Sequence, residues 1–547
     1  MNLWIDGLVI LTYFAVVIGV GLTKGSGEKT MEGFAIGDRQ IPWWAVLASI
    51  LAAEVSAATF LGAPGEGFAL RNFTYAQLSI GTVLGRIIIS FLFIKAYFDY
   101  RVVSIYEFLQ IRFGTVTKNA ASAIFLLTRV LASGTRLYVA AVILVLGWEM
   151  STGQKPTAGQ ELLIYVAALA LLTLLTALYT AAGGIKAVVW TDVIQASVMF
   201  SSIIFSIFYL LHQIPNGWNG ALAKLTQPGD LCFFRFETIS EGTFWSGMKK
   251  LLETEYTIWA AVLGATFLTM ATHGTDQDMV QRMLTAKDHQ RSRLALILSG
   301  LADLPVVLGF LLVGILLYVF YQYNPDPNLP TQNPRVFAYF ILRELPMGIR
   351  GLLIAGLFAT AMGSLSTAIN ALATSFTRDW YLPYINPSAE GMAVVRAARW
   401  ATAAFAVILV AVGSITSWVV IMVPGSRIIP IVLGIFGYTY GSLLGVFLVG
   451  MVTKTRGNDR GNLLAMLCGF LVVLILSGLL DDILKLLGLP PGPWFNILPV
   501  IAFPWRIFFG AIVTFFVGIF FSTPKEVMEK TVKHLETENT GIFVKNS

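Results

Sequence analysis

Small oxygen-bearing side chains crowd one apolar segment of the chain, FATAMGSLSTAINALATSFTRDWY at 358–381, directly after the apolar run GLLIAGL. Three of them, Thr360, Ser364 and Thr367, are spaced i, i+4 and i+7, so a helix would place them on one face. Hydroxyl oxygens suit a hard cation, but they also hydrogen-bond to the carbonyl one turn back and help helices pack. The spacing leaves both roles open. The segment also carries Ser366, Asn370 and Thr374.

Ionisable residues fall inside other apolar segments. Each would cost roughly 2.5–3.5 kcal/mol at the centre of a bilayer, so such groups should face a cavity or one another. Glu54 can pair with Arg129 or Arg136, or one of these arginines can hold a carboxylate of a solute. Arg86 is expected to do no more than anchor a helix. Asp192 begins a span after YTAAGGIKAVVWTD, where it can meet ions on the cytoplasmic side; Asp303 is also within a span.

The elements that must position these residues are membrane helices. Of the 547 residues, 56% are hydrophobic and only 12% are charged, about half the charge of a typical soluble domain. Apolar runs of about 20 residues, long enough to cross a bilayer, recur along the whole chain. We predict an all-α polytopic membrane protein with about thirteen spans. They are 3–22, 43–62, 76–97, 119–148, 161–182, 190–212, 255–275, 293–321, 349–372, 394–416, 425–451, 462–481 and 503–522.

The positions of the basic residues predict the orientation. If the N-terminus lies outside, the inside loops hold most of the cations, whereas the short outside loops hold mostly single ones. We therefore expect a multi-pass protein of the cytoplasmic (inner) membrane, with the N-terminus outside and the C-terminus inside. The expected inside cations are Lys24, Lys29, Arg39, Arg101, Arg112, Lys118, Arg282, Lys287, Arg291, Arg293, Lys454, Arg456, Arg460 and the tail lysines Lys525, Lys530 and Lys533.

Several functions are disfavoured by the composition. The four histidines and two cysteines show no ligand spacing, and no nucleophile–base pair is evident, so we do not expect an enzyme or an organic cofactor. The net charge of +6 follows from membrane insertion, and no basic patch with interleaved aromatics indicates nucleic-acid binding. Residues 1–547 are expected to form a single transmembrane domain within the lipid bilayer, with no obligatory protein partner evident.

Two spans contain helix-breaking signals. The second, PWWAVLASILAAEVSAATFLGAPGEG, carries polar residues at mid-depth and then glycines and a proline, and the seventh, LGATFLTMATHGTDQDMVQR, is loosened by threonines and a glycine. Interrupted helices at matching places in two halves indicate a transporter built from inverted repeats. The repeats would be 43–212 and 255–451, with 3–22, 462–481 and 503–522 as additional helices. Kinked helices packed through small residues are the alternative interpretation.

Four strings, in order along the chain, resemble the solute:sodium symporter family: SIYEFLQIRFG (104–114), YTAAGGIKAVVWTDVIQ (179–195), HGTDQDMVQRMLTAKD (273–288) and 351–381. That family includes sodium-driven transporters for sugars, sialic acid, proline, monocarboxylates, vitamins and iodide. The resemblance implies a leucine-transporter-like fold with two inverted five-helix repeats, which works by alternating access. It implies a sodium-coupled symporter that imports a small polar solute such as a sugar, a sugar acid or another carboxylate, with the sodium ion as coupling ion.

The resemblance also implies ion sites. A first sodium would lie between the second and ninth spans, on the backbone carbonyls of Ala52, Val55 and Thr360 and the side chain of Ser364. A second, in some members, would use Asp192, Ser366 and Thr367. Where the family usually has Ser-Ser, this chain has Gly363 followed by a serine. The change removes a hydroxyl that could contact both ion sites, so we predict one sodium per cycle.

Substrate positions carried over from the family are Glu54, Ser56, Thr59, Gln77, Thr269 and Thr272, and relatives that bind acidic solutes use an arginine where this chain has Arg129 and Arg136. An acidic solute is slightly favoured over a neutral sugar. A proton-coupled transporter of the same fold, with Asp192 or Asp303 as relay, and a membrane solute sensor are the alternatives, and a membrane-embedded enzyme is the least favoured.

Overall fold

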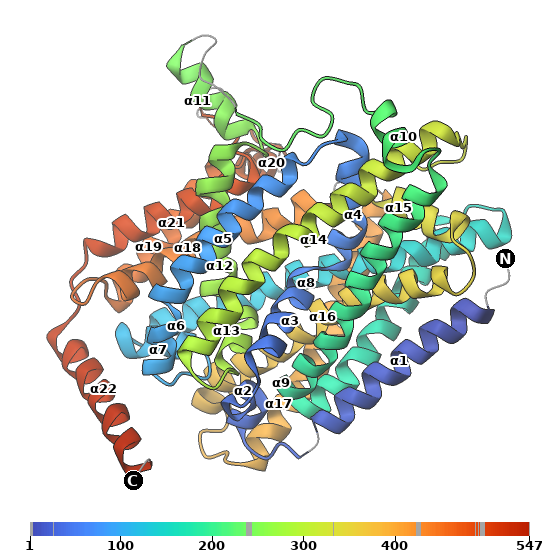
Figure 1. Ribbon diagram of the computed structural model, residues 1–547. Helices are drawn as coiled ribbons and strands as arrows, with labels where there is room; N and C mark the ends of the chain where they lie inside the picture. The colour runs from blue at the N-terminus through green and yellow to red at the C-terminus, as the bar shows by residue number, and fades with distance from the viewer. Residues whose placement is uncertain are drawn as a thin grey trace.

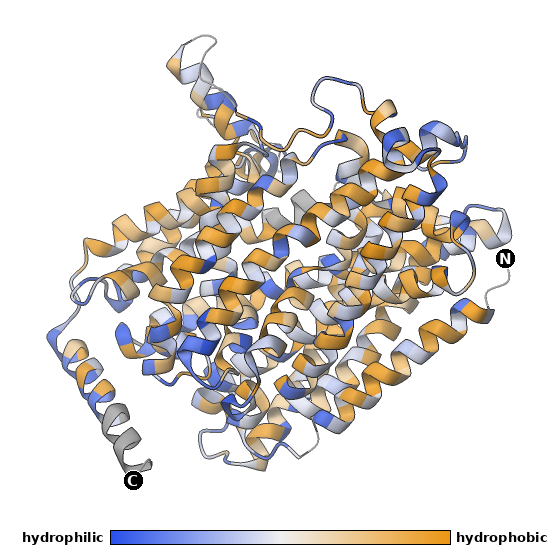
Figure 2. Ribbon diagram, viewed as in Figure 1, coloured by the Kyte–Doolittle hydropathy of each residue, from blue (hydrophilic) through white to orange (hydrophobic). Residues whose placement is uncertain are grey.

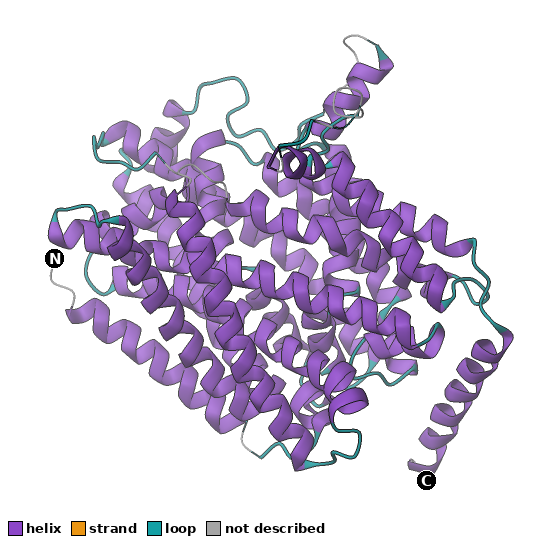
Figure 3. Cartoon of the chain, turned by 180° about the vertical axis from the view of Figure 1, so that it is seen from behind, coloured by secondary structure: helices purple, strands orange, loops and turns teal. Residues whose placement is uncertain are grey.

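The computed structural model describes residues 4–25, 27–236, 243–331, 333–422, 428–486, 488–490, 492 and 498–545. Within these ranges the chain consists of helices and loops, and its β contacts are two isolated bridges, between Ile41 and Ala286 and between Arg456 and Ser522 (Figure 3). The all-helical prediction is therefore confirmed. The first residues of the predicted span 425–451, namely 425–427, lie outside the described residues.

Long helices run beside one another through the molecule (Figure 1). They are α1 (Trp4–Lys24), α5 (Leu78–Leu92), α8 (Thr115–Thr152), α9 (Ala158–Gln213), α14 (His289–Tyr323), α16 (Ile349–Phe376), α17 (Met392–Met422), α18 (Ile428–Val452), α19 (Asp459–Leu476) and α21 (Phe503–Ile519). The other α-helices are α2 (Met31–Ile36), α3 (Trp43–Glu54), α4 (Ala57–Leu70), α6 (Ile94–Asp99), α7 (Tyr106–Arg112), α10 (Gly217–Lys224), α11 (Phe244–Glu253), α12 (Thr266–Gly274), α13 (Gln277–Leu284), α15 (Asn333–Glu344), α20 (Leu479–Leu486) and α22 (Lys525–Lys545).

Short 3₁₀- and π-helical segments join these elements. The 3₁₀ turns are η1 (Gly37–Arg39) and η2 (Thr74–Gln77), and the π-helical segments are η3 (Ala260–Ala265) and η4 (Thr377–Ile385). One end of the bundle carries α10 and α11, and the opposite end carries α22 (Figure 1). We refer to these ends as the α11 face and the α22 face.

Apolar residues dominate the long helices, and hydrophilic residues gather in the loops and at the two ends (Figure 2). In the described part of the chain, nine helices are long and apolar enough to cross a membrane, and a tenth results if the bent pair α3–α4 is one span. The predicted count of thirteen remains a prediction. One reason why fewer helices qualify as spans than predicted is α21, which has only 17 residues.

A second reason is α9, which covers two predicted spans. Gly184 interrupts this 56-residue helix with φ 55° and ψ −146°, between the predicted spans 161–182 and 190–212. A Cβ atom at Gly184 would lie 2.3 Å from the carbonyl oxygen of Phe34, so this close approach to the backbone before α3 also requires glycine. The chain thus changes direction where the sequence predicts a boundary between spans.

The hydroxyl-rich helix α16 lies at the centre of the bundle. In its most apolar window 89% of the residues are buried, against 22% for α1 and for α17, which face outward. Helix α16 packs against α9, α8, α1 and α3. The polar atoms of α16 therefore face other helices rather than lipid, as expected for functional groups inside a membrane protein.

Breaks between helices occur at both places where the sequence predicts them, and the first, between α3 and α4, divides a pair long and apolar enough to be one broken span. Helices α3 and α4 are bent by 65° at Val55 and Ser56, whose backbones are extended. Helices α12 and α13 are separated by Thr275 and Asp276, and the Asp276 side chain caps α13 by accepting from the backbone N–H of Asp278. The Gly-Pro-Gly residues expected to disturb the second span instead lie inside the continuous helix α4.

Candidate functional site: a polar cavity between broken helices

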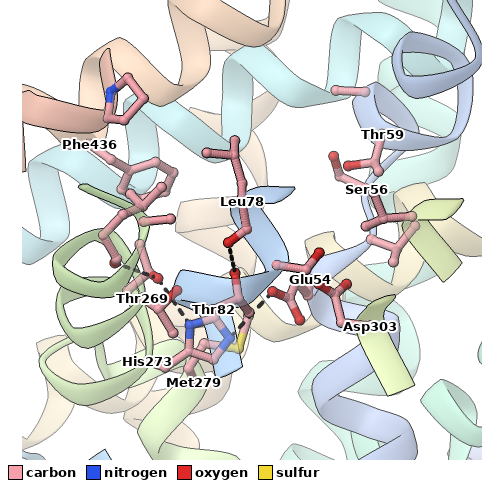
Figure 4. Close-up of a pocket in the computed structure, with 18 of the residues that line it drawn as sticks. Glu54, Ser56, Thr59, Leu78, Thr82, Thr269, His273, Met279, Asp303 and Phe436 are labelled. Carbon is pink, nitrogen blue, oxygen red and sulfur yellow. Dashed lines mark hydrogen bonds and ion pairs between the residues drawn. The ribbon is translucent and has the colours of Figure 1, made fainter. Parts of the chain in front are cut away.

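A cavity of about 200 Å³ lies beside the break between α3 and α4. Because roughly 10–15 Å³ of such volume holds one water, this space suits a small organic molecule rather than a single ion. Its walls come from α3, α4, η2, α5, α8, η3, α12, α13, α14, α18 and the α11 end of α21, and Figure 4 shows part of this lining. Of the predicted substrate residues, the lining includes Glu54, Ser56, Thr59, Arg129, Arg136, Thr269 and Thr272.

Glu54 pairs with Arg86, which corrects the predicted partners Arg129 and Arg136. The Arg86 guanidinium donates to the Glu54 carboxylate and, at 2.9 Å, to the hydroxyl of Ser299. His273 Nε2 lies 3.8 Å from the Glu54 carboxylate (Figure 4). Arg86 is fully buried and neutralises Glu54, so it does more than anchor a helix, contrary to the prediction. The pairing arises because α5 packs beside α14 and α12, a tertiary relation that chain order does not specify.

Arg129 and Arg136 differ in their partners, although both line the cavity. Arg129 forms ion pairs with Asp276 and, at 3.0 Å, with Asp278. The guanidinium of Arg136 lies 5.1 Å from the ring centre of Phe436, a cation–π distance. Among the described side chains none forms a hydrogen bond or an ion pair with Arg136. This arginine is therefore the cation available to a ligand in the cavity.

Gln77 lies outside this cavity, contrary to the prediction. Its amide nitrogen donates to the carbonyl of Tyr256 at 3.1 Å, and its amide oxygen accepts from the backbone N–H of Arg235. Gln77 is fully buried and holds the segment that precedes η3 against η2. Tyr75, two residues earlier, lines the cavity instead. Residues 74–77 form a 3₁₀ turn rather than a regular helix, and the position carried over from the family resemblance therefore does not place Gln77 in the cavity.

Helix α13 closes the cavity toward the α22 face. Every side chain of this helix is buried, and Met279 contributes to the cavity lining. Asp276 accepts hydrogen bonds from Arg129 and from the hydroxyl of Tyr440, which joins α8 and α18 to the start of α13. Arg282 pairs with Asp278 at 2.7 Å, so it lies inside the protein and not in an inside loop as predicted. We call Arg129, Asp276, Asp278 and Arg282 the α13 charge cluster.

The components predicted for a first sodium site lie on α3, at its end, and on α16, two elements that pack against each other. No backbone N–H of the described residues donates to the carbonyls of Ala52 or Val55, which the helix break leaves free. On α16, Ser364 is partly exposed although its neighbours are buried, and its hydroxyl lies 3.1 Å from the carbonyl of Thr360, to which it can donate. A hydroxyl that donates in this way still offers lone pairs to a cation.

At Gly363, helix α16 closely approaches the end of α3 and a side chain of α9. A Cβ atom on Gly363 would lie 2.9 Å from the carbonyl oxygen of Ala52 and 3.0 Å from the amide oxygen of Gln195. Gln195 is buried, and neither amide atom has a hydrogen-bond partner of good geometry among the described residues. The amide oxygen of Gln195 and the carbonyl oxygen of Ala52 therefore both lie against Gly363, an arrangement that the sequence motif containing Gln195 does not predict.

The side chains predicted for a second sodium site already have partners within the protein. Asp192 accepts a hydrogen bond from Ser49 and lies 3.6 Å from the guanidinium of Arg282, so a fixed cation already faces it. The hydroxyls of Ser366 and Thr367 donate to the carbonyls of Gly363 and Ser364. One oxygen of Asp192 has no hydrogen-bond partner among the described residues.

Sequence reasoning missed several residues of the site. Arg282 and Asp276 lie in the motif HGTDQDMVQRMLTAKD, which was used for recognition but not for chemistry. His273, Tyr75 and Phe436 line the cavity without having been assigned to it. Only His273 lies beside a predicted helix break, and such proximity does not specify where a side chain points; the positions of Tyr75 and Phe436 carry no signal of this kind.

The sequence of the chain is similar to those of proteins of known class. A profile of the sodium:solute symporter family matches residues 34–469. The sodium/sialic acid symporter SiaT of Proteus mirabilis is 25% identical over 480 residues, 86% of this chain and 89% of the relative. The sodium/glucose cotransporter of Vibrio parahaemolyticus is 27% identical over 429 residues, 75% of this chain and 74% of the relative.

The fold is shared as well. A substrate-bound, outward-open structure of a Na⁺-coupled sialic acid symporter superimposes with a TM-score of 0.76 at 22% identity, and the match covers 94% of this chain and 97% of that one.

Together the broken helices, the buried polar cavity and the family match define a secondary transporter of the leucine-transporter-like fold, not an enzyme. The chain belongs to the sodium:solute symporter family. It is a sodium-coupled symporter, and sodium is its coupling ion. The predictions of fold, transport class and coupling ion are thus confirmed.

Proposed function

We propose that this symporter carries a small polar solute with a carboxylate, which binds in the cavity through Arg136. The observation that supports this most directly is the guanidinium of Arg136, which lines the cavity without a partner among the described side chains. An unpaired charge is costly inside a membrane, so a bidentate carboxylate would stabilise it. Ser56, Thr59, Thr269 and Thr272 supply hydroxyls for the remaining polar atoms of the solute.

The coupling sodium is proposed to bind at Ala52, Val55, Thr360 and Ser364. The helix break leaves the carbonyls of Ala52 and Val55 free, and α16, which packs against α3, carries the Thr360 carbonyl and the Ser364 hydroxyl. Sodium is a hard cation that prefers such oxygens, and unwound helices supply them. Asp192, Ser366 and Thr367 form at most a weak second site, because Arg282 already provides a positive charge beside Asp192. One sodium per solute is therefore proposed.

We place the α22 face in the cytoplasm and the α11 face outside, in the cytoplasmic (inner) membrane. The support is the accumulation of basic residues in the loops on one side of the chain's spans. Residues 43–212 and 255–451 are proposed as the inverted repeats, since each range opens on a broken span, α3–α4 in the first and α12–α13 in the second. The cavity lies between these two broken spans.

Uptake into proteoliposomes tests the proposal. The purified protein is reconstituted, and radiolabelled sugar acids, monocarboxylates, amino acids and neutral sugars are offered under an inward sodium gradient. Carboxylate-bearing solutes should accumulate in sodium but not in choline, and Arg136→Gln should abolish their uptake while sodium still binds. Equal uptake in sodium and choline, or accumulation driven by a proton gradient alone, would contradict sodium coupling. Uptake restricted to neutral sugars would contradict the role of Arg136.

A further inference from the structure

The cavity has a second charged pole, formed by Glu54 and Asp303. Figure 4 shows these two side chains beside each other, on the side of the cavity away from Phe436. Arg136 lies against Phe436, so its positive charge is at the other side. The cavity therefore presents an arginine at one side and two carboxylates at the other.

The charges of the second pole do not balance. Glu54 is neutralised by Arg86, which is fully buried and also donates to Ser299. Asp303 lies in the middle of α14 with 7% of its surface exposed, and among the described residues it has neither a hydrogen bond nor an ion pair. Two carboxylates thus share one arginine. With Asp303 ionised, and with His273, 3.8 Å from the Glu54 carboxylate, neutral, one negative charge faces the cavity, opposite the positive charge of Arg136.

Two unpaired and opposite charges on facing walls are costly in a membrane interior unless a ligand satisfies both. A solute with a carboxylate alone would satisfy Arg136 but would bring a second anion toward Asp303. A neutral sugar would satisfy neither. From this arrangement, and resting on the proposed function, we infer that the transported solute is a zwitterion whose carboxylate binds Arg136 and whose ammonium group binds Asp303 beside Glu54.

The threonines of the cavity are consistent with a polar body between these charged ends. Thr269 and Thr272 lie on α12, and Ser56 and Thr59 lie at the start of α4, so hydroxyls flank both sides of the space between the poles (Figure 4). The expected solute class is an amino acid or an amino sugar acid that carries hydroxyl groups.

Matched solutes test this inference in the purified full-length protein at saturating sodium. One set shares a six-carbon skeleton: glucosaminate, gluconate, glucosamine and glucose. The other shares a three-carbon skeleton: serine, glycerate, serinol and glycerol. Within each set the members carry both charges, the carboxylate only, the amine only, or neither. Dissociation constants are measured by calorimetry.

At least one zwitterion should bind tenfold or more tightly than both singly charged analogues. Equal or tighter binding of gluconate or glycerate, or no binding of either zwitterion, overturns the inference. Sodium-driven uptake of carboxylates that lack an amine would leave the proposed function intact, so the two failures are distinguishable. A protonated Asp303 would have no charge to attract the ammonium group. The hydroxy acid should then bind as tightly as the amino acid, so the same measurement detects this case.

Two variants extend the test and add a readout, the melting temperature, that needs no solute. Asp303→Asn should remove the tenfold preference for the amine while the carboxylate-only analogue still binds, and Arg136→Gln should do the reverse. Each removes an unpaired buried charge, so each should raise the melting temperature of the solute-free protein. The exposed residues Asp99 and Arg291 provide the matched controls Asp99→Asn and Arg291→Gln, which should change neither quantity. A lower melting temperature for Asp303→Asn would show a structural role and overturn the inference.

Discussion

The Glu54–Arg86 pair shows how much a buried charge depends on its partner. Arg86 has no exposed surface, and its guanidinium is held by Glu54, Ser299 and the neighbouring His273. Removal of one member of a buried pair leaves an uncompensated charge, whereas removal of both does not. The pair is therefore expected to be coupled strongly in stability.

We predict that Arg86→Met lowers the free energy of unfolding by about 3–5 kcal/mol, and that Glu54→Gln lowers it less, because Asp303 still faces Arg86 in that variant. The double variant should lose clearly less than the sum. Chemical denaturation in detergent measures this cycle. The exposed pair Lys95–Asp99 on α6 is the control, with an expected coupling below ~1 kcal/mol. Additive losses for Glu54 and Arg86 would show that the two charges do not act as a pair.

A second prediction concerns the oxygens beside Gly363. Gln195→Leu keeps the shape of the side chain but removes the free amide oxygen near Ala52, and Ser364→Ala removes the hydroxyl of α16. Each should raise the sodium concentration for half-maximal binding about tenfold, because one oxygen ligand or its support is lost, while the fold remains intact. Sodium titration followed by intrinsic fluorescence measures the change. Gln213→Leu, on an exposed position of the same helix, should leave it unchanged.

Much of this chemistry could be predicted from the sequence, because hydroxyls and charges within apolar runs stand out by type alone. Thr269, Thr272, Ser56 and Thr59 reach the cavity as expected. Which charges pair could not be predicted. Glu54 selects Arg86 rather than Arg129 because of how separate helices pack, and Arg129 is taken by Asp276 from a helix break whose geometry no periodicity specifies.

At the scale of elements, α13 joins parts of the bundle that are far apart in sequence. Arg282 contacts Asp278 on its own helix, Asp192 on α9 and Ser49 on α3. Asp276, just before α13, contacts Arg129 on α8 and Tyr440 on α18. If the α22 face opens during the cycle, these contacts must separate, because they hold the floor of the cavity in place. The break before α13 was predicted from its glycine and threonines, but this set of contacts was not.

Asp192→Asn should therefore impair movement more than binding. The amide keeps the contact with Ser49 but removes the negative charge near Arg282. The equilibrium between conformations with the α13 contacts formed and with these contacts broken therefore shifts. We expect the maximal uptake rate to fall at least tenfold with the solute dissociation constant changed less than threefold. Rates from proteoliposomes and dissociation constants from calorimetry separate the two effects, and Asp38→Asn on the surface is the control. A tenfold loss of solute affinity with an unchanged rate would contradict this role.

At the scale of the whole molecule, one sodium per cycle limits accumulation. A sodium ion entering down ~100 mV and a tenfold gradient releases roughly 2.3 plus 1.4 kcal/mol, which supports a few hundredfold accumulation of a solute without net charge. Two ions would raise this limit to roughly 10⁵-fold. The fixed charge of Arg282 beside Asp192 argues for the lower value.

We therefore predict one elementary charge moved per solute of zero net charge, and a hyperbolic dependence on sodium. Simultaneous recording of current and tracer flux in proteoliposomes measures the ratio. A charge-to-solute ratio of two, or a Hill coefficient near two, would establish a second coupled ion.

The position of the α13 charge cluster also determines where the electric field of the membrane is concentrated. On the α11 side the cavity is lined by Phe503, which directly follows a residue hydrogen-bonded to α11, and toward the α22 face it ends at the buried side chains of α13. Whenever the cavity is open to water at its α11 side, that water conducts the outside potential inward, and most of the voltage falls across the thin layer that contains the cluster. Solute and ion entry should then sense little voltage. The step that rearranges α13 should sense most of the ~2.3 kcal/mol that 100 mV supplies per charge, so voltage would control the rate of turnover rather than the affinity.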